Sequence, residues 1–231
     1  MTGRDFRNAL VNSTAKAEPP KAKAPEKGVF RPLPFTGDDI ALVEGLRAGH
    51  PGAIAAFYDR YATHVQRVLA RVLGTDRELS DVHHDVFVRA LGSVKDIAEP
   101  AALKAWITQV TVFTARTCIQ KRSRRWWLRL LPPDEVPEQE TPPSSGEVNE
   151  AVQATYTVLE KLPADERIAF ALRFVDGMEL TEVALACGVS LATIKRRLAR
   201  AEDRFLAMAR RQPALKEWLE GGARWGSMTP R

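Results

Sequence analysis

Apolar residues recur every three or four positions along most of this chain, and that spacing is typical of amphipathic helices rather than strands. The clearest helix spans residues 53–74, ends at Gly74 and carries one apolar stripe. The stripe consists of Ile54, Phe57, Tyr58, Tyr61, Val65, Val68, Val72 and Leu73. Similar patterns predict helices over residues 38–48, 76–91 and 102–127, so four helices can enclose one small core.

A second helical region is expected over residues 149–211. Within it, LTEVALACG predicts a short helix that stops at Gly188, and Ser190 is a favourable N-cap for the helix that follows. A short helix, a glycine turn and a capped helix are the layout of a helix-turn-helix. Ala184 is small where the two helices would cross, which fits this interpretation. No strand pattern and no internal repeat is found.

The final helix of this region has an apolar face and a basic face. The apolar face is formed by Ile194, Leu198, Ala201, Phe205 and Met208. Arg196 and Arg200 lie opposite, with Lys195 and Arg197 on the flanks. Basic side chains that face away from the core near the start of such a helix suit the major groove of DNA. An ordinary solvated basic face is the alternative, and the glycine turn with its capped helix favours DNA binding.

The segment LPPDEVPEQETPPSSGEVN lies between the two helical regions and holds five prolines and several acids, so it predicts an extended linker. We therefore expect an all-α protein of two small helical domains joined by a flexible, acidic, proline-rich linker, the second being a helix-turn-helix domain. The expected parts are a disordered tail (1–36), a four-helix domain (37–128), the linker (129–148), the helix-turn-helix domain (149–211) and a C-terminal tail (212–231), in which ALKEWLE predicts one helical turn.

Charge is distributed unevenly along the 231 residues, although the net formal charge is only +5. Basic clusters at 116–129 and 195–211 flank an acidic segment at 134–150, which indicates two contacts with a polyanion. No apolar run is long enough for a membrane span, and no secretory signal is recognised. Cys118 and Cys187 are far apart and lie among apolar residues, so buried thiols in a reducing cytoplasm are expected.

The helix over 102–127 is predicted to have two different faces. Leu103, Ile107, Val110, Thr114 and Cys118 are expected to point into the core. The opposite face carries Trp106, Gln109, Phe113, Arg116 and Gln120. Exposed aromatic rings among Gln and Arg fit a surface that stacks unpaired bases and holds phosphates. Packing of Trp106 and Phe113 under the preceding loop is the alternative.

This helix runs into KRSRRWWLRLLPP, residues 121–133. Its basic residues are expected to contact phosphates. Its tryptophans and leucines are expected to face protein, because the segment is too short for a helix lying on a membrane and no second anchoring signal is present.

In DVHHD, residues 81–85, the side chains of Asp81, His84 and Asp85 share one helix face, opposite Val82 and Val86. Carboxylate and imidazole at helical spacing can hold a metal, but no further His or Cys is placed to complete the site. A solvated face is the simpler interpretation. We expect no metal or other cofactor. An enzyme is disfavoured as well, since no phosphate-binding glycine loop and no nucleophile constellation is present.

Taken in order, these segments resemble the extracytoplasmic-function sigma factors of bacterial RNA polymerase, over residues 38–211. AFYDRYATHVQRVL, LSDVHHDVFVRAL and AWITQVTVFTARTCIQKRSRR look like the parts of their region 2. LEKLPADERIAFALRFVDGMELTEVALACGVSLATIKRRLARAEDRF is similar to their region 4. The resemblance implies an alternative sigma factor that binds core RNA polymerase, recognises −35 DNA with region 4 and melts −10 DNA with region 2, without covalent chemistry of its own.

The resemblance also assigns roles to the candidate residues. Those expected at −35 DNA are Ser190, Thr193, Lys195, Arg196, Arg197 and Arg200. Those expected at −10 DNA are Trp106, Gln109, Phe113, Arg116, Gln120 and Lys121. Asp81, His84 and Asp85 are expected on polymerase, although His84 and Asp85 replace the Gln and Glu of the family pattern. Phe113 replaces an Asn that often reads a −10 base, so the −10 preference is expected to be unusual.

The implied partners are core RNA polymerase and promoter DNA in the bacterial cytoplasm, without membrane insertion, and the resemblance leaves room for an anti-sigma factor. The competing hypothesis is a stand-alone helix-turn-helix regulator that binds DNA without polymerase. The polar face of Asp81, His84 and Asp85 separates the two, because a sigma factor needs such a docking face and a free-standing regulator does not.

Overall fold

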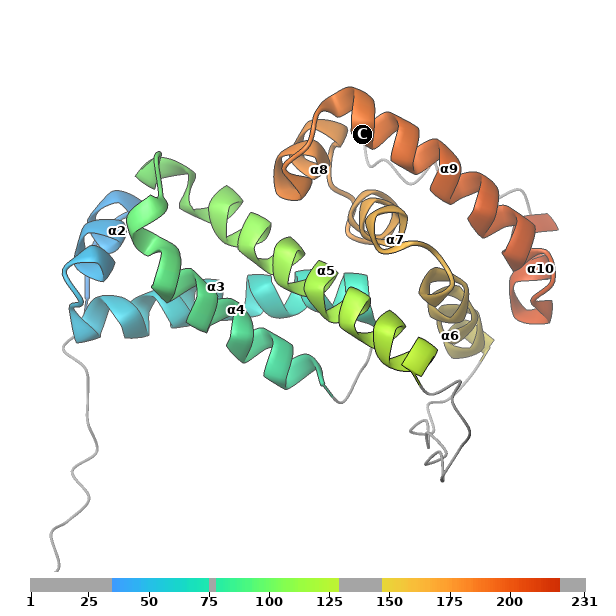
Figure 1. Cartoon of the computed structure of the whole chain (residues 1–231), viewed down its shortest axis with the longest axis horizontal. Coiled ribbons are helices and arrows are strands. Elements are labelled where there is room, and N and C mark those ends of the chain that lie inside the picture. Colours follow the sequence, from blue (N-terminus) through green and yellow to red (C-terminus); the bar gives the residue numbers. More distant parts are fainter. Residues whose placement is uncertain (1–34, 75–77, 129–146, 221–231) are drawn as a thin grey trace, which may run out of the picture. The chain divides into compact units, whose positions relative to one another are not determined.

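The computed structural model describes residues 35–74, 78–128 and 147–220 (Figure 1). All regular secondary structure within these ranges is helical, so the predicted all-α fold is confirmed. The predicted tail at 1–36 and the linker at 129–148 lie almost entirely outside the described residues. The same holds for the side chains of Trp126 and Trp127, and the predicted domain boundaries stay predictions.

The first helical block contains four α-helices, which are α2 (Asp39–Arg47), α3 (Pro51–Leu73), α4 (Leu79–Ser93) and α5 (Leu103–Leu128). Their starts follow from local chemistry. The Asp38 carboxylate accepts the Ala41 N–H at 2.9 Å and caps α2. At α3, the His50 ring accepts the Gly52 N–H at 3.1 Å, and a proline occupies the first helical position, where its missing N–H is harmless.

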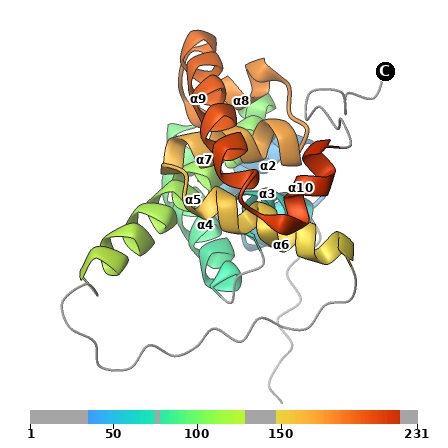
Figure 2. The same cartoon turned by 90° about the vertical axis from the view of Figure 1, so that its right-hand side faces the viewer.

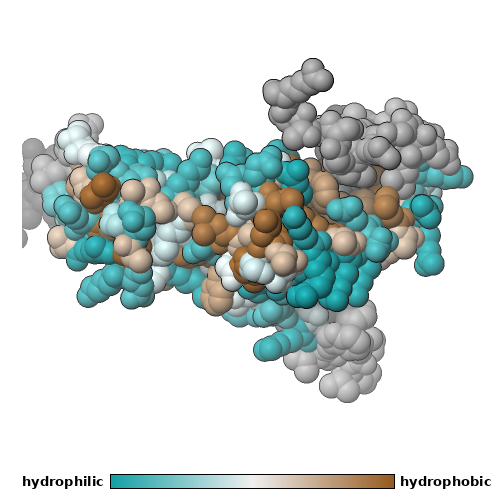
Figure 3. All heavy atoms as spheres, turned by 90° about the horizontal axis from the view of Figure 1, so that it is seen from above, coloured by the Kyte–Doolittle hydropathy of each residue, from teal (hydrophilic) through white to brown (hydrophobic). Residues whose placement is uncertain are grey.

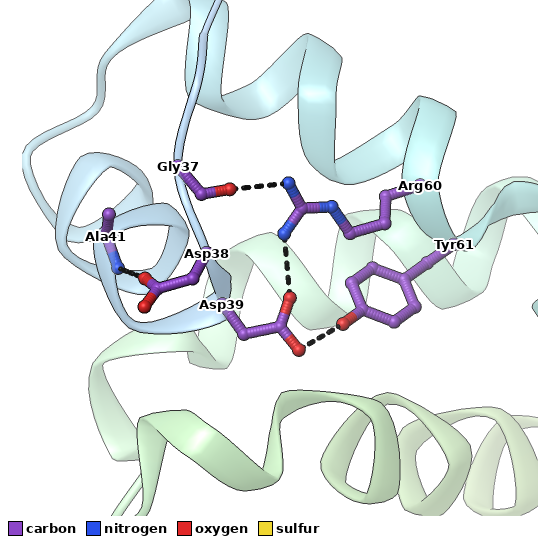
Figure 4. A network of polar contacts seen from close by, with 6 residues as sticks. All are labelled: Gly37, Asp38, Asp39, Ala41, Arg60 and Tyr61. Carbon is purple, nitrogen blue, oxygen red and sulfur yellow. Dashed lines mark hydrogen bonds and ion pairs between the residues drawn. The ribbon is translucent and has the colours of Figure 1, made fainter.

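A network of polar contacts ties α2 to α3 (Figure 4). Asp39 accepts hydrogen bonds from Arg60 at 2.8 Å and from the Tyr61 hydroxyl at 2.7 Å. Arg60 also donates to the Gly37 carbonyl at 2.7 Å. Burial, and next the contact with Asp39, raise the pKa of Tyr61 well above its ordinary value, so the phenol keeps its proton as donor. The start of the described chain is therefore fixed to the long helix α3.

The predicted core of the first block is confirmed for most of its members. Phe57, Val65, Val68 and Val72 of α3 are buried, as are Val82, Val86 and Ala90 of α4 and Leu103 and Ile107 of α5. Two residues of the predicted stripe differ, because the side chains of Ile54 and Tyr58 are 39% and 48% exposed. The Tyr58 ring lies instead against the rings of His83 and Phe87, on the rim of the core.

The second block contains α6 (Glu147–Glu160), α7 (Ala164–Phe170), α8 (Leu180–Cys187), α9 (Leu191–Ala209) and α10 (Pro213–Glu220), and a π-type turn over Ala171–Val175 continues α7. Its centre is a stacked pair of rings, Phe170 and Phe205, with centroids 4.6 Å apart. Helix α10 lies against α6 (Figure 2) and buries Leu215 there. It is longer than the single turn expected from ALKEWLE.

The two blocks are joined where α3 ends, by side chains of the second block. Arg167 of α7 is almost fully buried and donates to the carbonyls of Val72 at 2.9 Å and Leu73 at 3.2 Å. The Tyr156 hydroxyl of α6 donates to the Ala70 carbonyl at 3.2 Å. Burial lowers the pKa of Arg167, but a guanidinium is so weak an acid that it stays charged in proteins. A cation is favourable here, because the last carbonyls of a helix lack intrahelical donors and carry partial negative charge.

We predict that Arg167→Met lowers the free energy of unfolding by about 1–3 kcal/mol, since two buried carbonyls lose their donor. Urea denaturation followed by circular dichroism measures this difference. Arg210→Met removes an exposed arginine from the end of α9 and should stay within about 0.5 kcal/mol of the unaltered chain. Equal stability of the two variants would contradict the role given to Arg167.

Candidate nucleic-acid interface

Helices α8 and α9 form the predicted helix-turn-helix, and Gly188 makes the turn between them. Its φ of +64° lies in the left-handed region, which a glycine adopts without steric cost. The Gly188 and Val189 N–H groups donate to the carbonyls of Leu185 and Ala184 and so close the end of α8. At the other end of α8, Glu182 accepts the Glu179 N–H at 2.9 Å. Both ends of this short helix are therefore defined by its own sequence.

Ser190 starts α9 as predicted. Its hydroxyl accepts the Thr193 N–H at 3.2 Å and lies 3.0 Å from the Thr193 hydroxyl. The Ser190 side chain is exposed and that of Thr193 is half-buried. Both candidate residues thus lie together at the N-terminal end of α9, where N–H groups without intrahelical partners favour an anion.

The apolar and basic faces of α9 are as predicted, with one exception on each. Ile194, Leu198, Ala201 and Phe205 are buried, whereas Met208 is only half-buried. Lys195, Arg196 and Arg200 are exposed on the other side. Arg197 is half-buried, and its guanidinium meets the Asp165 carboxylate of α7 at 2.7 Å. Three of the four basic residues predicted to contact DNA are therefore presented to solvent, and Arg197 is held by the protein.

The candidate residues of α5 lie in three different environments. The Phe113 ring is 55% exposed, and the Arg89 guanidinium of α4 lies over it, 5.6 Å from its centroid. Gln120 and Lys121 are exposed. Trp106 is half-buried and packs against the core of the first block.

Gln109 and Arg116 of α5 contact the second block. The Gln109 amide donates to the Leu185 carbonyl of α8 at 2.7 Å. The Arg116 guanidinium lies 2.8 Å from the Asp165 carboxylate. A crevice runs between these helices, lined by Gln109, Val112, Phe113 and Arg116 of α5 and by Ala186, Cys187 and Gly188. Burial raises the pKa of Cys187 to about 11, so its thiol stays protonated there.

The side chains of Asp81, His84 and Asp85 are exposed, and Val82 and Val86 are buried on the other side of α4. The neighbouring His83 turns inward and lies 3.1 Å from the Ala62 carbonyl. In the part of the chain that the structure describes, no group of three or more His, Cys, Asp or Glu is arranged to hold a metal. The geometry therefore gives a polar surface rather than a ligand set.

Two residues with a part in this site were missed by the sequence analysis. Asp165 is the shared partner of Arg116 and Arg197, and Arg89 covers Phe113. Asp165 lies in the first turn of α7, where an acidic residue is ordinarily explained by the helix dipole. The sequence carried no signal for either contact, because the partners lie far apart along the chain.

On the face drawn in Figure 3, apolar residues form small separate patches among hydrophilic ones. Large exposed apolar residues of the described chain include Phe113, Val88 and Leu185. Single exposed apolar residues are common on proteins, so exposure alone does not mark any of these three as a binding site. No helix within residues 35–74, 78–128 and 147–220 is long and apolar enough to cross a membrane.

Comparison with protein families gives two matches, one in each block. Residues 57–127 match the family described as Sigma-70 region 2, and residues 153–205 match Sigma-70, region 4. The order and position of these matches agree with the two segments singled out in the sequence.

Matches to characterised relatives extend over most of the length of each relative. The chain is 23% identical over 180 residues to the ECF RNA polymerase sigma-E factor of Haemophilus influenzae, covering 71% of this chain and 92% of the relative. It is 25% identical to the protein of the same name from Escherichia coli strain K12, covering 71% and 91%. Among solved structures, CnrH in complex with the cytosolic domain of CnrY matches with a TM-score of 0.50 and 19% identity, over 74% of this chain and 96% of that one, which is a likeness of fold.

We predict that Gly188→Ala destabilises the chain by about 1–2 kcal/mol, because a Cβ is unfavourable in the left-handed region. Apart from the two neighbouring residues, nothing lies within 4 Å of the added Cβ, so the cost comes from the backbone conformation. Gly188→Asn should cost less, because asparagine enters this region more readily. Urea denaturation tests the order of the three proteins, and an alanine variant as stable as the glycine form would refute the account of the turn.

Proposed function

This chain belongs to the sigma-70 family as an extracytoplasmic-function sigma factor, an alternative sigma factor that directs promoter-specific transcription, and we propose that α9 reads −35 DNA while α5 holds melted −10 DNA. The phosphodiester chemistry belongs to RNA polymerase in this proposal, and the chain supplies binding and selection. Such a factor acts where polymerase acts, so we expect it in the bacterial cytoplasm.

The observation that carries the −35 assignment is the position of Arg196 and Arg200. Both are exposed, they lie about one turn apart on α9, and they face away from buried Ile194 and Leu198. A helix that follows a glycine turn and presents arginines in this way can enter a major groove, where an arginine pairs with guanine O6 and N7. Lys195 adds a third exposed cation that suits phosphate.

The N-terminal end of α9 supports the same docking. Ser190 and Thr193 place their hydroxyls beside N–H groups that have no partner within the helix. A DNA phosphate at this end would meet hydroxyl donors and the positive end of the helix dipole. In this proposal the first turn of α9 holds the DNA backbone, and the next two turns of the same helix read bases.

The −10 assignment rests on Phe113, whose ring is exposed on α5 and covered on one side by Arg89. An exposed ring of this kind stacks an unpaired base, and the neighbouring guanidinium suits a phosphate. Gln120 and Lys121 extend the surface by two further turns of α5. Because Phe113 offers a ring where the family often has an Asn, this position would stack a base without reading its hydrogen-bonding edge.

Core RNA polymerase is the partner proposed for the exposed face of Asp81, His84 and Asp85 on α4. These side chains make no contact that the core of the first block requires, since Val82 and Val86 bury the opposite face. CnrH was solved with the cytosolic domain of CnrY. We extend to this chain the expectation of a regulatory protein partner, an anti-sigma factor.

The −35 assignment predicts distinct effects for two single variants, Arg196→Ala and Arg200→Ala, each assayed as holoenzyme against a library of −35 sequences at fixed salt. If the arginine reads a base, its replacement by alanine should lower discrimination at one promoter position by about 1–3 kcal/mol. If the arginine contacts a phosphate, its replacement should weaken binding to all sequences equally and lower the slope of affinity against salt by about one unit. We expect at least one of the two to read a base.

Arg210→Ala is the matched control, because it removes an exposed arginine from the far end of the same helix. It should leave the −35 preference unchanged. If both test variants select every sequence as the unaltered holoenzyme does, α9 is not the reader of −35 DNA.

The polymerase assignment predicts that Asp81→Arg combined with Asp85→Arg weakens binding to core polymerase by about tenfold or more, since the charge of the proposed docking face would be reversed. The fold should persist, which circular dichroism can verify. Glu44→Arg combined with Asp59→Arg makes the same charge change at exposed positions of α2 and α3 and should bind normally. Equal affinities for the two double variants in a titration with core polymerase would rule out docking through α4.

A further inference from the structure

We infer that residues 1–34, which form the N-terminal arm of the chain, bind the DNA duplex that follows the melted segment of a promoter, through its phosphates rather than its bases. This inference rests on the proposed function, because it requires α5 to hold −10 DNA. It adds a third contact with DNA, which raises affinity for a promoter without changing the sequence that is selected.

The N-terminal arm carries most of the net charge of the chain. It holds seven of the 34 Lys and Arg residues and three of the 29 Asp and Glu residues, a net +4 of the total +5. The rest of the chain is therefore nearly neutral. Five prolines lie between residues 19 and 34, and proline is unfavourable in the interior of a helix. This composition favours contact with a polyanion over burial in a core.

The folded chain fixes the point at which the N-terminal arm joins it. The Phe35 ring is half-buried and packs against the core of the first block. It lies over Gly45 of α2, where an added Cβ would be 3.0 Å from a ring carbon, and its centroid is 6.0 Å from that of the His50 ring. Two residues after Phe35, the Gly37 carbonyl accepts a hydrogen bond from Arg60. The arm is therefore joined to the first block at a defined place beside α2.

That place lies near the start of α5. Helix α2 packs against the 3-10 turn Pro100–Ala102, which leads into α5, and Arg47 of α2 donates to the Ile97 carbonyl just before this turn. The other end of α5, at Leu128, leads through residues 129–146 to the block that is proposed to read −35 DNA. Because −35 DNA lies upstream of −10 DNA, the start of α5 and the arm beside it face the duplex downstream of the melted segment.

The acids nearest to the arm in sequence do not offer it a competing site. The Asp38 carboxylate caps α2, and Asp39 is held by Arg60 and Tyr61 (Figure 4). A duplex, in contrast, presents about one negative charge for every 1.7 Å of its length. When α5 and α9 already hold the promoter, the arm is tethered close to this DNA, which raises its effective concentration there. DNA is therefore favoured over the acidic groups of the chain itself.

The test replaces Lys21, Lys23 and Lys27 together by Gln in the full chain and measures the affinity of the reconstituted holoenzyme for a promoter fragment at several salt concentrations. Each lysine that contacts a phosphate contributes about 0.9 to the slope of log affinity against log salt, so the slope should become less steep by about two to three units. The −35 and −10 preferences should stay the same, because no base contact is lost. The difference should disappear on a fragment that ends where the melted segment ends.

Lys161→Gln combined with Arg210→Gln and Arg211→Gln is the control for net charge, because these residues are exposed and lie outside every surface proposed to bind DNA. It should leave the slope within about half a unit of that of the unaltered chain. The inference is overturned if the arm variant behaves like this control, or if its effect persists on the shortened fragment.

Two further outcomes would assign the arm to another partner and likewise overturn the inference. One is weaker binding of the arm variant to core polymerase in the absence of DNA. The other is loss of binding to vesicles of anionic phospholipid with an unchanged salt slope on DNA. Equal slopes with normal promoter selection would overturn the inference alone, whereas failure of the unaltered holoenzyme to select any promoter would overturn the proposed function and the inference with it.

Discussion

The arrangement of both helical blocks depends on α5 being buried on two sides. One side packs on α3 and α4, and another meets α7 and α8. Thr108, Thr111 and Thr114 are buried along this helix, and each hydroxyl donates to a carbonyl one turn earlier at 2.7–2.8 Å. Each hydroxyl thus has an acceptor within α5 itself, which lets the helix carry these polar groups into an apolar interior. Only a limited part of its surface remains for a ligand, and Phe113 lies there.

The double burial of α5 also explains where the sequence analysis succeeded and where it did not. Helices with one buried face, such as α3 and α9, have a periodic pattern that gave their limits and most of their core. For α5 the same reasoning placed Val110 and Cys118 in the core, yet both are half-buried, whereas Val112 and Ala115 are buried. A single apolar stripe cannot describe a helix with two contact surfaces, because the position of the second depends on the other block.

The candidate site shows the same division between local and distant causes. Gly188 and Ser190 act through the backbone within a few residues of themselves, so the turn and the start of α9 could be predicted from sequence. Arg197 could not be separated from Arg196 and Arg200, because its partner Asp165 lies 32 positions away in another helix. Pairing of charges between distant helices is fixed by tertiary packing, and a charge pattern along one helix does not contain it. The arginines left exposed by that pairing are the ones to which the −35 assignment is given.

The central claim is that this chain gives RNA polymerase a promoter specificity, and reconstituted transcription tests it most directly. Purified core polymerase is incubated with the chain and with genomic DNA of the source bacterium, and the 5′ ends of the transcripts are sequenced. The account predicts co-purification of the chain with core polymerase and a limited set of start sites that share upstream sequence and vanish when the chain is omitted. A chain that binds those DNA sequences but neither associates with core polymerase nor changes its start sites would contradict the account and establish a stand-alone regulator.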